Sequence, residues 1–191
     1  MKTSLEEILI GHKQAVDKSF SPEQVLILED ITRLLFETLK KGNKLLLCGN
    51  GGSAADAQHI AAEFIARFRL ERKSLPAIAL TTDTSILTAI ANDYTFDRVF
   101  SRQVEGLGDK GDMLIGISTS GNSKNILEAV QQAKSQGLRT VGFAGAKGGK
   151  LKELCDICFC AQTDKTSHVQ EIHITSLHAI SEVVEEMMFH S

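Results

Sequence analysis

The sequence predicts an α/β fold in which helices cover both faces of a parallel sheet. Three observations lead to this prediction: short apolar runs recur along the chain, segments of helical periodicity separate them, and two of the runs end in loops rich in glycine and serine. Continuously apolar strands are typical of a sheet that is buried on both faces. Their alternation with helices indicates right-handed crossovers, which place all strand carboxyl ends at one edge, where ligands bind.

The length and charge of the chain limit the number of domains and the kinds of partner that it can have. Its 191 residues suit one domain, residues 1–191, with N-terminal helices over 1–42 and an α/β core over 43–191. The net charge of −3 argues against a nucleic-acid partner or an acidic membrane surface, because both need a basic excess. No apolar run is long enough to span a bilayer, and residues 1–13 lack the apolar core of a signal peptide. We therefore expect a cytoplasmic protein.

Two helices are expected within the first 42 residues. The first has apolar residues at helical spacing between Leu5 and His12. The second begins at Ser21-Pro22-Glu23, where serine suits an N-cap and proline suits the first helical position. Its apolar positions follow a period of about 3.6 residues. They are Val25, Leu26, Leu28, Ile31, Leu34, Leu35 and Leu39.

Five strands and five further helices are expected beyond residue 42. The strands are the apolar runs at 44–48, 77–80, 112–117, 140–144 and 157–160, and the helices cover 54–69, 86–91, 98–107, 125–136 and 169–189. The last strand lies among Cys155, Cys158 and Cys160, whose Cys-x-x-Cys spacing is also that of half a zinc site. Because no second ligand pair stands at comparable spacing, a buried strand is the better interpretation.

The loops at 49–53 and 118–123 suit a phosphate group. Each follows a strand and precedes a helix, so backbone N–H groups at the helix start can surround an anion. The second loop adds four hydroxyl groups, from Ser118, Thr119, Ser120 and Ser123. Neither loop has the Lys-Ser/Thr of a Walker A motif, and the acidic residue expected about twenty residues after a dinucleotide-binding loop is missing. One such loop could be only a turn, but two at the same sheet edge favour phosphate binding.

Two helices carry polar side chains that could take part in chemistry. His59 and Glu63 are four residues apart and share one helical face, which suits metal ligands or a general acid-base pair. Glu63 could instead form an ordinary ion pair with Arg67. On the last helix, Gln170 and His178 lie about 12 Å apart along the axis and about 80° apart around it. They could flank one site only with a metal or a substrate between them.

Four segments, taken together, are specific to one family. They read CGNGGSAADAQH, TAIANDYTFDRVFSRQVEGLG, GISTSGNSKNI and VQEIH, in this order from about residue 44 to the last helix. They resemble the phosphoheptose isomerases, a branch of the SIS (sugar isomerase) family. The resemblance implies a three-layer α/β/α sandwich with a five-stranded parallel sheet, preceded by N-terminal helices, and a homotetramer with active sites at subunit interfaces.

The reaction that the resemblance implies is an aldose–ketose isomerisation. It converts D-sedoheptulose 7-phosphate to D-glycero-D-manno-heptose 7-phosphate through an enediol, as the first step towards ADP-heptose for lipopolysaccharide core or capsule. Such a reaction moves one proton beside a carbonyl and another between two oxygens, for which a carboxylate and an imidazole are suitable.

The resemblance also implies roles for individual residues. The family's substrate-binding positions match Asn50, Gly51, Gly52, Ser53, Glu63, Asn92, Asp93, Ser118, Thr119, Ser120, Ser123 and Gln170, of which Ser118, Thr119, Ser120 and Ser123 form its phosphate loop. The residues that hold one zinc ion per subunit in some members match His59, Glu63, Gln170 and His178. The family's acid/base pair matches Glu63 and His178.

One position departs from the family pattern, and two other functions share the fold. The family usually has arginine two residues before Gln170, where this chain has His168, which lacks the bidentate guanidinium group. The alternatives are SIS proteins that bind a replication initiator protein and modules that sense a sugar phosphate. The former lack the full glutamate and histidine set and the latter lack the catalytic carboxylate, so Glu63 and His178 favour an enzyme.

Overall fold

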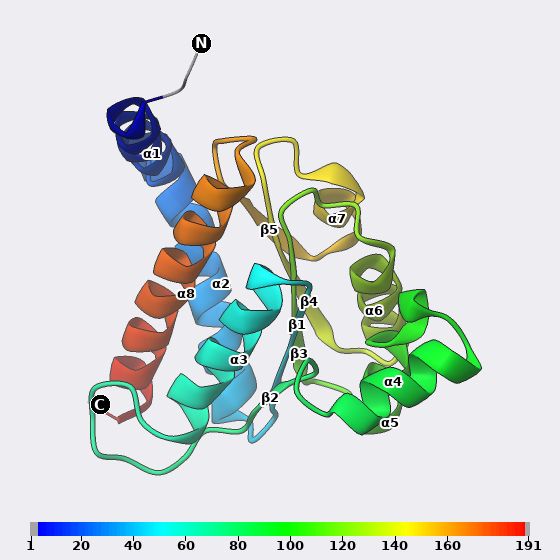
Figure 1. The fold of residues 1–191 in the computed structure, drawn as a ribbon. Coiled ribbons are helices and arrows are strands. Elements are labelled where there is room, and N and C mark those ends of the chain that lie inside the picture. Colours follow the sequence, from blue (N-terminus) through cyan, green and yellow to red (C-terminus); the bar gives the residue numbers. More distant parts are fainter. Residues whose placement is uncertain (1–3, 190–191) are drawn as a thin grey trace.

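A five-stranded parallel sheet lies between two layers of helices (Figure 1). The structure, a computed structural model, describes residues 4–189, so residues 1–3 and 190–191 of the predicted domain lie outside the described residues. The strands are β1 (Leu45–Gly49), β2 (Ala77–Ala79), β3 (Met113–Ser118), β4 (Arg139–Ala144) and β5 (Ile157–Cys160). Every neighbouring pair is parallel, as the continuous apolar runs predicted.

The helices divide between the two faces of the sheet. One layer contains α1 (Leu5–Ser19), α2 (Pro22–Lys40), α3 (Gly52–Ile65) and α8 (Thr166–Phe189). The other contains α4 (Thr84–Asp93), a short 3-10 helix (Phe96–Arg98), α5 (Ser101–Leu107), α6 (Lys124–Ser135) and α7 (Gly149–Leu154). Each layer buries its own hydrophobic cluster against the sheet.

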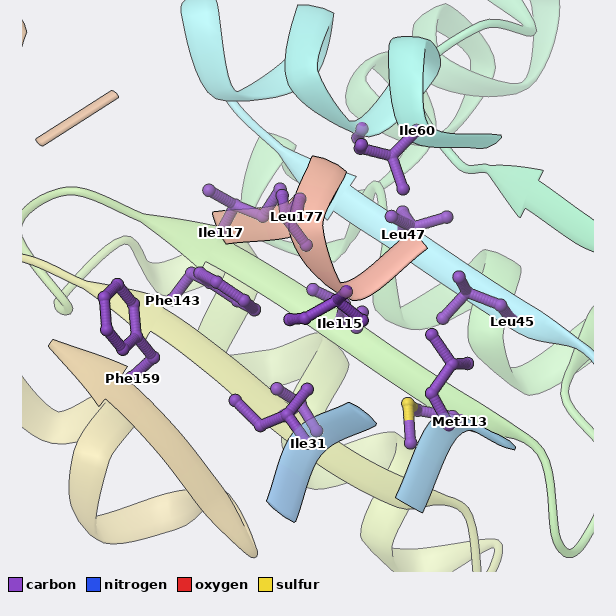
Figure 2. Packing of buried hydrophobic residues seen from close by; sticks show 14 of the residues in the cluster. Ile31, Leu45, Leu47, Ile60, Met113, Ile115, Ile117, Phe143, Phe159 and Leu177 are labelled. Atoms are coloured by element: carbon purple, nitrogen blue, oxygen red, sulfur yellow. The ribbon is translucent and has the colours of Figure 1, made fainter. Parts of the chain in front are cut away.

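The alternation of side chains along the central strands separates the two clusters. Leu45, Leu47, Met113 and Ile115 point toward α2, α3 and α8, as Figure 2 shows. The residues between them on the same strands, such as Leu46, join the cluster formed with α5 and α6. Because successive side chains of a strand face opposite sides, a continuously apolar strand fills both layers.

Local signals start the N-terminal helices, although one of them differs from the prediction. Ser4 and Glu7 form a reciprocal capping box, with each side chain accepting a hydrogen bond from the other's backbone N–H at 2.8 and 3.1 Å. Pro22 stands in the first turn of α2 as predicted. Ser21 precedes it, but its hydroxyl donates to the carboxylate of Glu23 at 2.8 Å and makes no side-chain cap to the described backbone.

Several boundaries differ from the periodicity-based prediction. The helix predicted over 54–69 begins at Gly52 and ends at Ile65, because residues 68–70 turn away to donate backbone hydrogen bonds to Glu185. The helix predicted over 98–107 is interrupted after a 3-10 turn and resumes at Ser101. The six-residue helix α7 was missed, since it is too short to show a period.

The strand order places the two small-residue loops beside each other. The order is β2-β1-β3-β4-β5, so the connection from β1 runs one way across the sheet and the connections from β3 run the other way. Such a reversal opens a crevice at the carboxyl ends of the two central strands, where α/β folds bind ligands. Here those strands are β1 and β3, followed by the loop at 50–51 with the first residues of α3 and by the loop at 119–123.

The cysteine-containing strand matches the sequence-based interpretation. Cys158 and Cys160 lie in strand β5, and all four cysteines are free thiols, with Cys155 buried beside that strand. Within residues 4–189, none of the helices combines the length and the apolar character that a membrane span requires.

Candidate active site

The two loops at the crevice are joined by a pair of amides. The side chains of Asn50 and Asn125 exchange two hydrogen bonds, each 2.9 Å long. Asn125 is buried in the first turn of α6, so this pair fixes the loop after β1 against the helix that follows β3. The predicted substrate loop and the predicted phosphate loop therefore form one continuous rim.

The end of β3 and the loop after it carry four hydroxyl groups, and those of three serines lie close together. We call Ser118, Thr119, Ser120 and Ser123 the phosphate cradle. The Oγ atoms of Ser118 and Ser123 are 2.9 Å apart, and Ser118 and Ser120 Oγ are 3.5 Å apart. Gly121 has a φ of +65°, and a Cβ there would collide with the carbonyl oxygen of Gly148, so only glycine closes this turn.

The N-termini of α3 and α6 add backbone N–H groups at the same edge of the sheet. In the part of the chain that the structure describes, no side chain caps the first turn of α3 at Gly51 or of α6 at Ser123. The first N–H groups of a helix have no partner within the helix and carry partial positive charge. Together with the cradle hydroxyls, they suit a phosphate group.

A cavity of about 300 Å³ adjoins the cradle. Its lining includes Thr119 and Ser120 of the cradle together with Lys147, Asp164 and Thr166. The ammonium group of Lys147 is 3.8 Å from the carboxylate of Asp164. Sequence reasoning did not select Lys147, whose approach to the cradle depends on the turn between β4 and α7.

A second group of polar side chains lies where α3 packs along α8. We call His59, Glu63 and His178 the seam cluster. The Nε2 atom of His59 is 3.0 Å from Oε1 of Glu63 and 3.3 Å from Nε2 of His178. One donor atom from each of the three side chains lies within 4.8 Å of the other two. The sequence placed His59 and Glu63 on one face, and the fold brings His178 to them from 119 positions further along the chain.

The seam cluster offers three donor atoms of the kinds that hold a zinc ion in proteins. With Zn–N distances of about 2.0–2.1 Å, two imidazole nitrogens on a tetrahedral zinc lie about 3.3–3.4 Å apart. The two Nε2 atoms are 3.3 Å apart, and a carboxylate oxygen lies 3.0 Å from one of them. Two imidazoles and a carboxylate are a donor set that zinc accepts.

The surroundings of His178 favour its neutral form. The ring of Phe68 stacks on the His178 imidazole at a centroid distance of 5.7 Å and an angle of 14°. Burial, and secondly the charge of His59, lower the pKa of His178 below that of an ordinary imidazole, although Glu63 opposes the shift. A neutral imidazole can bind a metal or accept a proton.

Gln170 lies elsewhere in the same chain. Its side-chain amide lies against the backbone of Gly52, where an added Cβ would be 2.5 Å from Nε2 of Gln170. Among the described residues, no hydrogen bond joins Gln170 to His59, Glu63 or His178. Eight residues before His178, it lies about 12 Å away along α8. One chain therefore brings three of the four predicted metal ligands together and places the fourth at the substrate loop.

Asn92 and Asp93 end α4, which belongs to the other layer of helices. Their side chains are exposed and joined by a 2.9 Å hydrogen bond from Nδ2 of Asn92 to Oδ1 of Asp93. Every residue of α4 is at least partly exposed. The structure does not place this pair with the seam cluster of the same chain.

His168 and Asp56 show two environments that the sequence did not reveal. His168 is buried against His12 of α1, with ring centroids 5.0 Å apart, so it serves the packing of α1 on α8. Asp56 lies one helical turn before His59 in α3, and burial raises its pKa to about 6 although the charge of His59 opposes the shift. No pattern in the sequence singled out Asp56, which is half-buried in the folded chain.

Known proteins resemble this chain over most of its length. The SIS domain family matches residues 12–145. A phosphoheptose isomerase of Roseiflexus is 55% identical over 183 residues, covering 96% of this chain and 91% of that protein. A phosphoheptose isomerase of Aliarcobacter butzleri is 50% identical over 190 residues, and the match covers 100% of both chains.

A solved structure supports the same relationship. The phosphoheptose isomerase from Neisseria gonorrhoeae superposes with a TM-score of 0.85 at 41% identity, covering 96% of this chain and 100% of that one. The likeness confirms the predicted fold: a five-stranded parallel sheet, two covering layers and preceding N-terminal helices.

Proposed function

Because this chain belongs to the phosphoheptose isomerases of the SIS domain family, we propose that its chemistry takes place at the seam cluster. The enzyme interconverts D-sedoheptulose 7-phosphate and D-glycero-D-manno-heptose 7-phosphate, a step of heptose biosynthesis. The observation that carries the proposal is the convergence of His59, Glu63 and His178 within 4.8 Å. The initiator-binding and sugar-phosphate-sensing alternatives leave that convergence without a use.

Glu63 is the proposed base. Aldose–ketose isomerisation requires removal of a proton from the carbon beside the carbonyl, which gives an enediol, and return of a proton to the neighbouring carbon. Oε1 of Glu63 faces His59 at 3.0 Å, which leaves Oε2 for the substrate. The side chain is 21% exposed, so a ligand can reach it while much of the bulk water is excluded.

His178 is the proposed partner of Glu63. The second proton must move between the oxygens on the two reacting carbons, and a neutral imidazole can accept it from one and donate it to the other. The lowered pKa of His178, caused mainly by burial, keeps the imidazole neutral near pH 7. Phe68 limits its rotation by stacking on one face.

The phosphate cradle has the separate task of holding the substrate's far end. Hydroxyls of Ser118, Thr119, Ser120 and Ser123, with the open N–H groups of α6, supply donors for the 7-phosphate. Asn50, Gly51, Gly52 and Ser53, from the other side of the crevice, are proposed to contact the sugar. Binding energy gained at the phosphate positions the carbons that react.

Zinc is the proposed ion, one per subunit, with His59, Glu63 and His178 as ligands that this chain brings together. When bound, it polarises carbonyl and hydroxyl oxygens and stabilises negative charge that develops on them. Gln170, the fourth predicted ligand, lies beside Gly52, and we propose that it completes a seam cluster of another copy of the chain.

An assembly of four copies with active sites at subunit interfaces is therefore part of the proposal. It is supported by the separation of Asn92 and Asp93 from the seam cluster and by the exposure of α4. An apolar cavity of about 670 Å³ between α2 and α8, lined by Leu28, Ile180 and Val183 among others, offers a surface for a second copy.

Two broader expectations remain proposals. We propose that residues 1–191 act as one domain, supported by Ile31 and Leu35 of α2, which are buried in the same cluster as β1, β3 and α8. A cytoplasmic location is proposed on the four free thiols, since such thiols persist in a reducing compartment.

Turnover of sedoheptulose 7-phosphate by the purified protein tests the proposed function. The protein is first treated with a chelator and then assayed with and without added zinc. We expect conversion to the heptose phosphate that falls on chelation and returns with zinc. Absence of conversion under both conditions, in folded protein that binds the sugar phosphate, would contradict the enzymatic role. Full activity after chelation would contradict only the role of the metal.

A further inference from the structure

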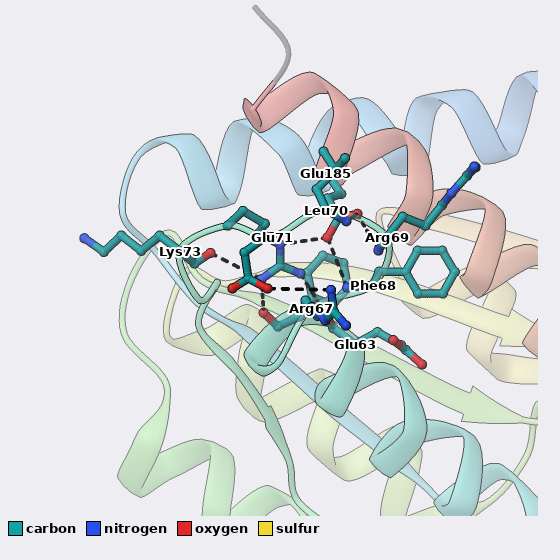
Figure 3. A network of polar contacts seen from close by, with 10 residues as sticks. Glu63, Arg67, Phe68, Arg69, Leu70, Glu71, Lys73 and Glu185 are labelled. Atoms are coloured by element: carbon teal, nitrogen blue, oxygen red, sulfur yellow. Dashed lines mark hydrogen bonds and ion pairs between the residues drawn. The ribbon is translucent and has the colours of Figure 1, made fainter.

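A buried network joins the two helices that carry the seam cluster. Glu185 follows His178 by seven residues on α8 and is 2% exposed. Its carboxylate accepts hydrogen bonds of 2.8 to 3.1 Å from the backbone N–H groups of residues 68–70, in the loop that follows α3. Figure 3 shows Glu185 reaching from α8 to this loop, with Glu63 at the nearby end of α3. The carboxylate thus fixes the segment that leaves α3.

Arg72 extends the network to Glu63 itself. Its Nε donates to Glu185 at 2.8 Å, and both side chains are almost fully buried. Its Nη2 donates to the backbone oxygen of Glu63 at 2.8 Å, and its Nη1 donates to that of Phe64 at 2.7 Å. Carbonyl groups in the last turn of a helix lack partners within the helix, and a cation there also favours the helix dipole. Arg72 therefore caps α3 at the residue that carries the proposed base.

Phe68 links the same network to His178. Its backbone N–H donates to Glu185 at 3.1 Å, and its ring stacks on the His178 imidazole at 5.7 Å. The loop that Glu185 holds thus supplies the wall on one side of His178. His59 lies on another side, edge-on to His178, with ring centroids 4.8 Å apart.

We propose that Glu185 and Arg72 are positioning residues for the reaction and set the separation of Glu63 from His178. This inference rests on the proposed function, because it assumes that Glu63 and His178 react together. Neither positioning residue touches the substrate. Arg72 acts through the backbone of Glu63, and Glu185 acts through Phe68 on His178.

The chain contains a matched control for this network. Asp112 is 1% exposed and accepts hydrogen bonds from the backbone N–H groups of Lys44 and Asp109, each 2.9 Å long. It also forms an ion pair with the side chain of Lys44. These residues join the amino ends of β1 and β3, the edge opposite the crevice. A carboxylate with comparable partners therefore stabilises a part of the fold that takes no part in the reaction.

The first test compares Glu185→Gln with Asp112→Asn. Each change keeps the side-chain shape, removes the charge of a buried carboxylate that accepts hydrogen bonds from backbone N–H groups and pairs with a cation, and should lower the melting temperature. For Glu185→Gln we expect kcat to fall about tenfold to a hundredfold, the scale of a small displacement of reacting groups. KM should change less than about twofold, because the phosphate cradle lies on the other side of the crevice. Asp112→Asn should retain the wild-type kcat at temperatures where it is folded.

A second test separates the effect of the network on the position of Glu63 from its effect on the stability of the fold. Combining Arg72→Met with Glu185→Gln removes both buried charges, which should recover stability lost by the single change. The carbonyl oxygens of Glu63 and Phe64 still lose their donor, so kcat should stay low if Arg72 positions Glu63. Phe68→Leu, which keeps the backbone bonds, should fold normally and lower kcat several-fold through His178 alone.

The outcomes distinguish this inference from the proposed function. If the double variant recovers both stability and kcat, or if Asp112→Asn loses kcat as Glu185→Gln does, the network is only structural and the inference fails. If wild-type protein turns over, Glu63→Gln is inactive and Glu185→Gln is fully active, the inference alone fails. Wild-type protein that does not turn over would instead overturn the proposed function on which it rests.

Discussion

The phosphate cradle and the seam cluster are built in different ways. The cradle comes from one loop of six residues, with hydroxyl groups, helix N–H groups and a glycine that permits the turn. The seam cluster comes from side chains on two helices, joined by a contact between His59 and His178 that spans 119 positions. The first is proposed to hold the substrate's phosphate and the second is proposed to change its carbon skeleton. Substitutions in the two regions should therefore alter different kinetic constants.

The largest effect is expected from Glu63→Gln. Replacing the carboxylate by an amide removes the base and keeps its shape, so kcat should fall by about a thousandfold, within the range of general base catalysis. The affinity for sedoheptulose 7-phosphate should stay near the wild-type value, since the cradle is unchanged. Steady-state kinetics and isothermal calorimetry measure the two quantities. Wild-type turnover in this variant would show that the seam cluster does not carry the base.

Ser120→Ala should change binding more than chemistry. Ser120 is exposed in the cradle, and its hydroxyl accepts a hydrogen bond from the Asn122 N–H at 3.1 Å. Loss of a hydrogen bond to a charged phosphate costs about 1.5–3 kcal/mol, or roughly tenfold to a hundredfold in KM. Ser135→Ala, at the far end of α6, is the matched control and should leave KM unchanged. A fall in kcat with unchanged KM would reverse the roles of the two regions.

The pH dependence of kcat/KM tests the proposed role of His178 in proton transfer. Its pKa is lowered, so the imidazole loses its proton at a pH below the ordinary value of about 6.5. If the neutral form is required, the acid limb of kcat/KM should lie below that value and should shift in His178→Gln. The profile of kcat/KM between about pH 5 and 9 measures it. A limb that stays unchanged in the variant would assign the titration to another group.

The smallest of these effects is the pH dependence of the stability that Glu185 contributes, which is separate from its effect on kcat. Burial alone would raise its pKa, but the N–H groups of residues 68–70 and Arg72 lower it. Its folded pKa thus lies below the unfolded value of about 4.3, so the stabilisation is present above that value and is lost as pH falls through the folded pKa. The stability difference between wild type and Glu185→Gln should shrink below about pH 4, which denaturant melts at several pH values can follow. A difference independent of pH would contradict the assignment.

The contrast between the two regions also explains what the sequence could predict. The cradle, the five strands and the pair His59 and Glu63 depend on local order along the chain, so spacing and composition indicate them. Membership of His178 in the cluster came from family resemblance, because its distance from His59 depends on how α3 packs along α8. Glu185 and Arg72 were missed because one is an ordinary glutamate on a helix and the other lies in an irregular loop.

Two further features of the fold could not be predicted from local sequence, because they depend on residues far away in the chain or on the spacing along a helix. The end of α3 at Ile65 has no sequence signal of its own, since the hydrogen bonds that redirect the chain come from Glu185. Gln170 and His178 share a helix, but their spacing of eight residues keeps them apart within one chain. In the proposed assembly, whether such residues meet depends on the arrangement of copies, which one sequence does not encode as a local pattern.

Exchange of solvent deuterium into sedoheptulose 7-phosphate, at the carbon from which the base takes its proton, tests the division of labour most directly. The measurement compares Glu63→Gln and Ser120→Ala with wild type in D₂O, each at saturating substrate, by NMR. We predict that Ser120→Ala still incorporates deuterium at close to the wild-type rate and that Glu63→Gln does not. Incorporation by Glu63→Gln at the wild-type rate, or its loss in Ser120→Ala alone, would contradict the assignment of chemistry to the seam cluster and of binding to the phosphate cradle.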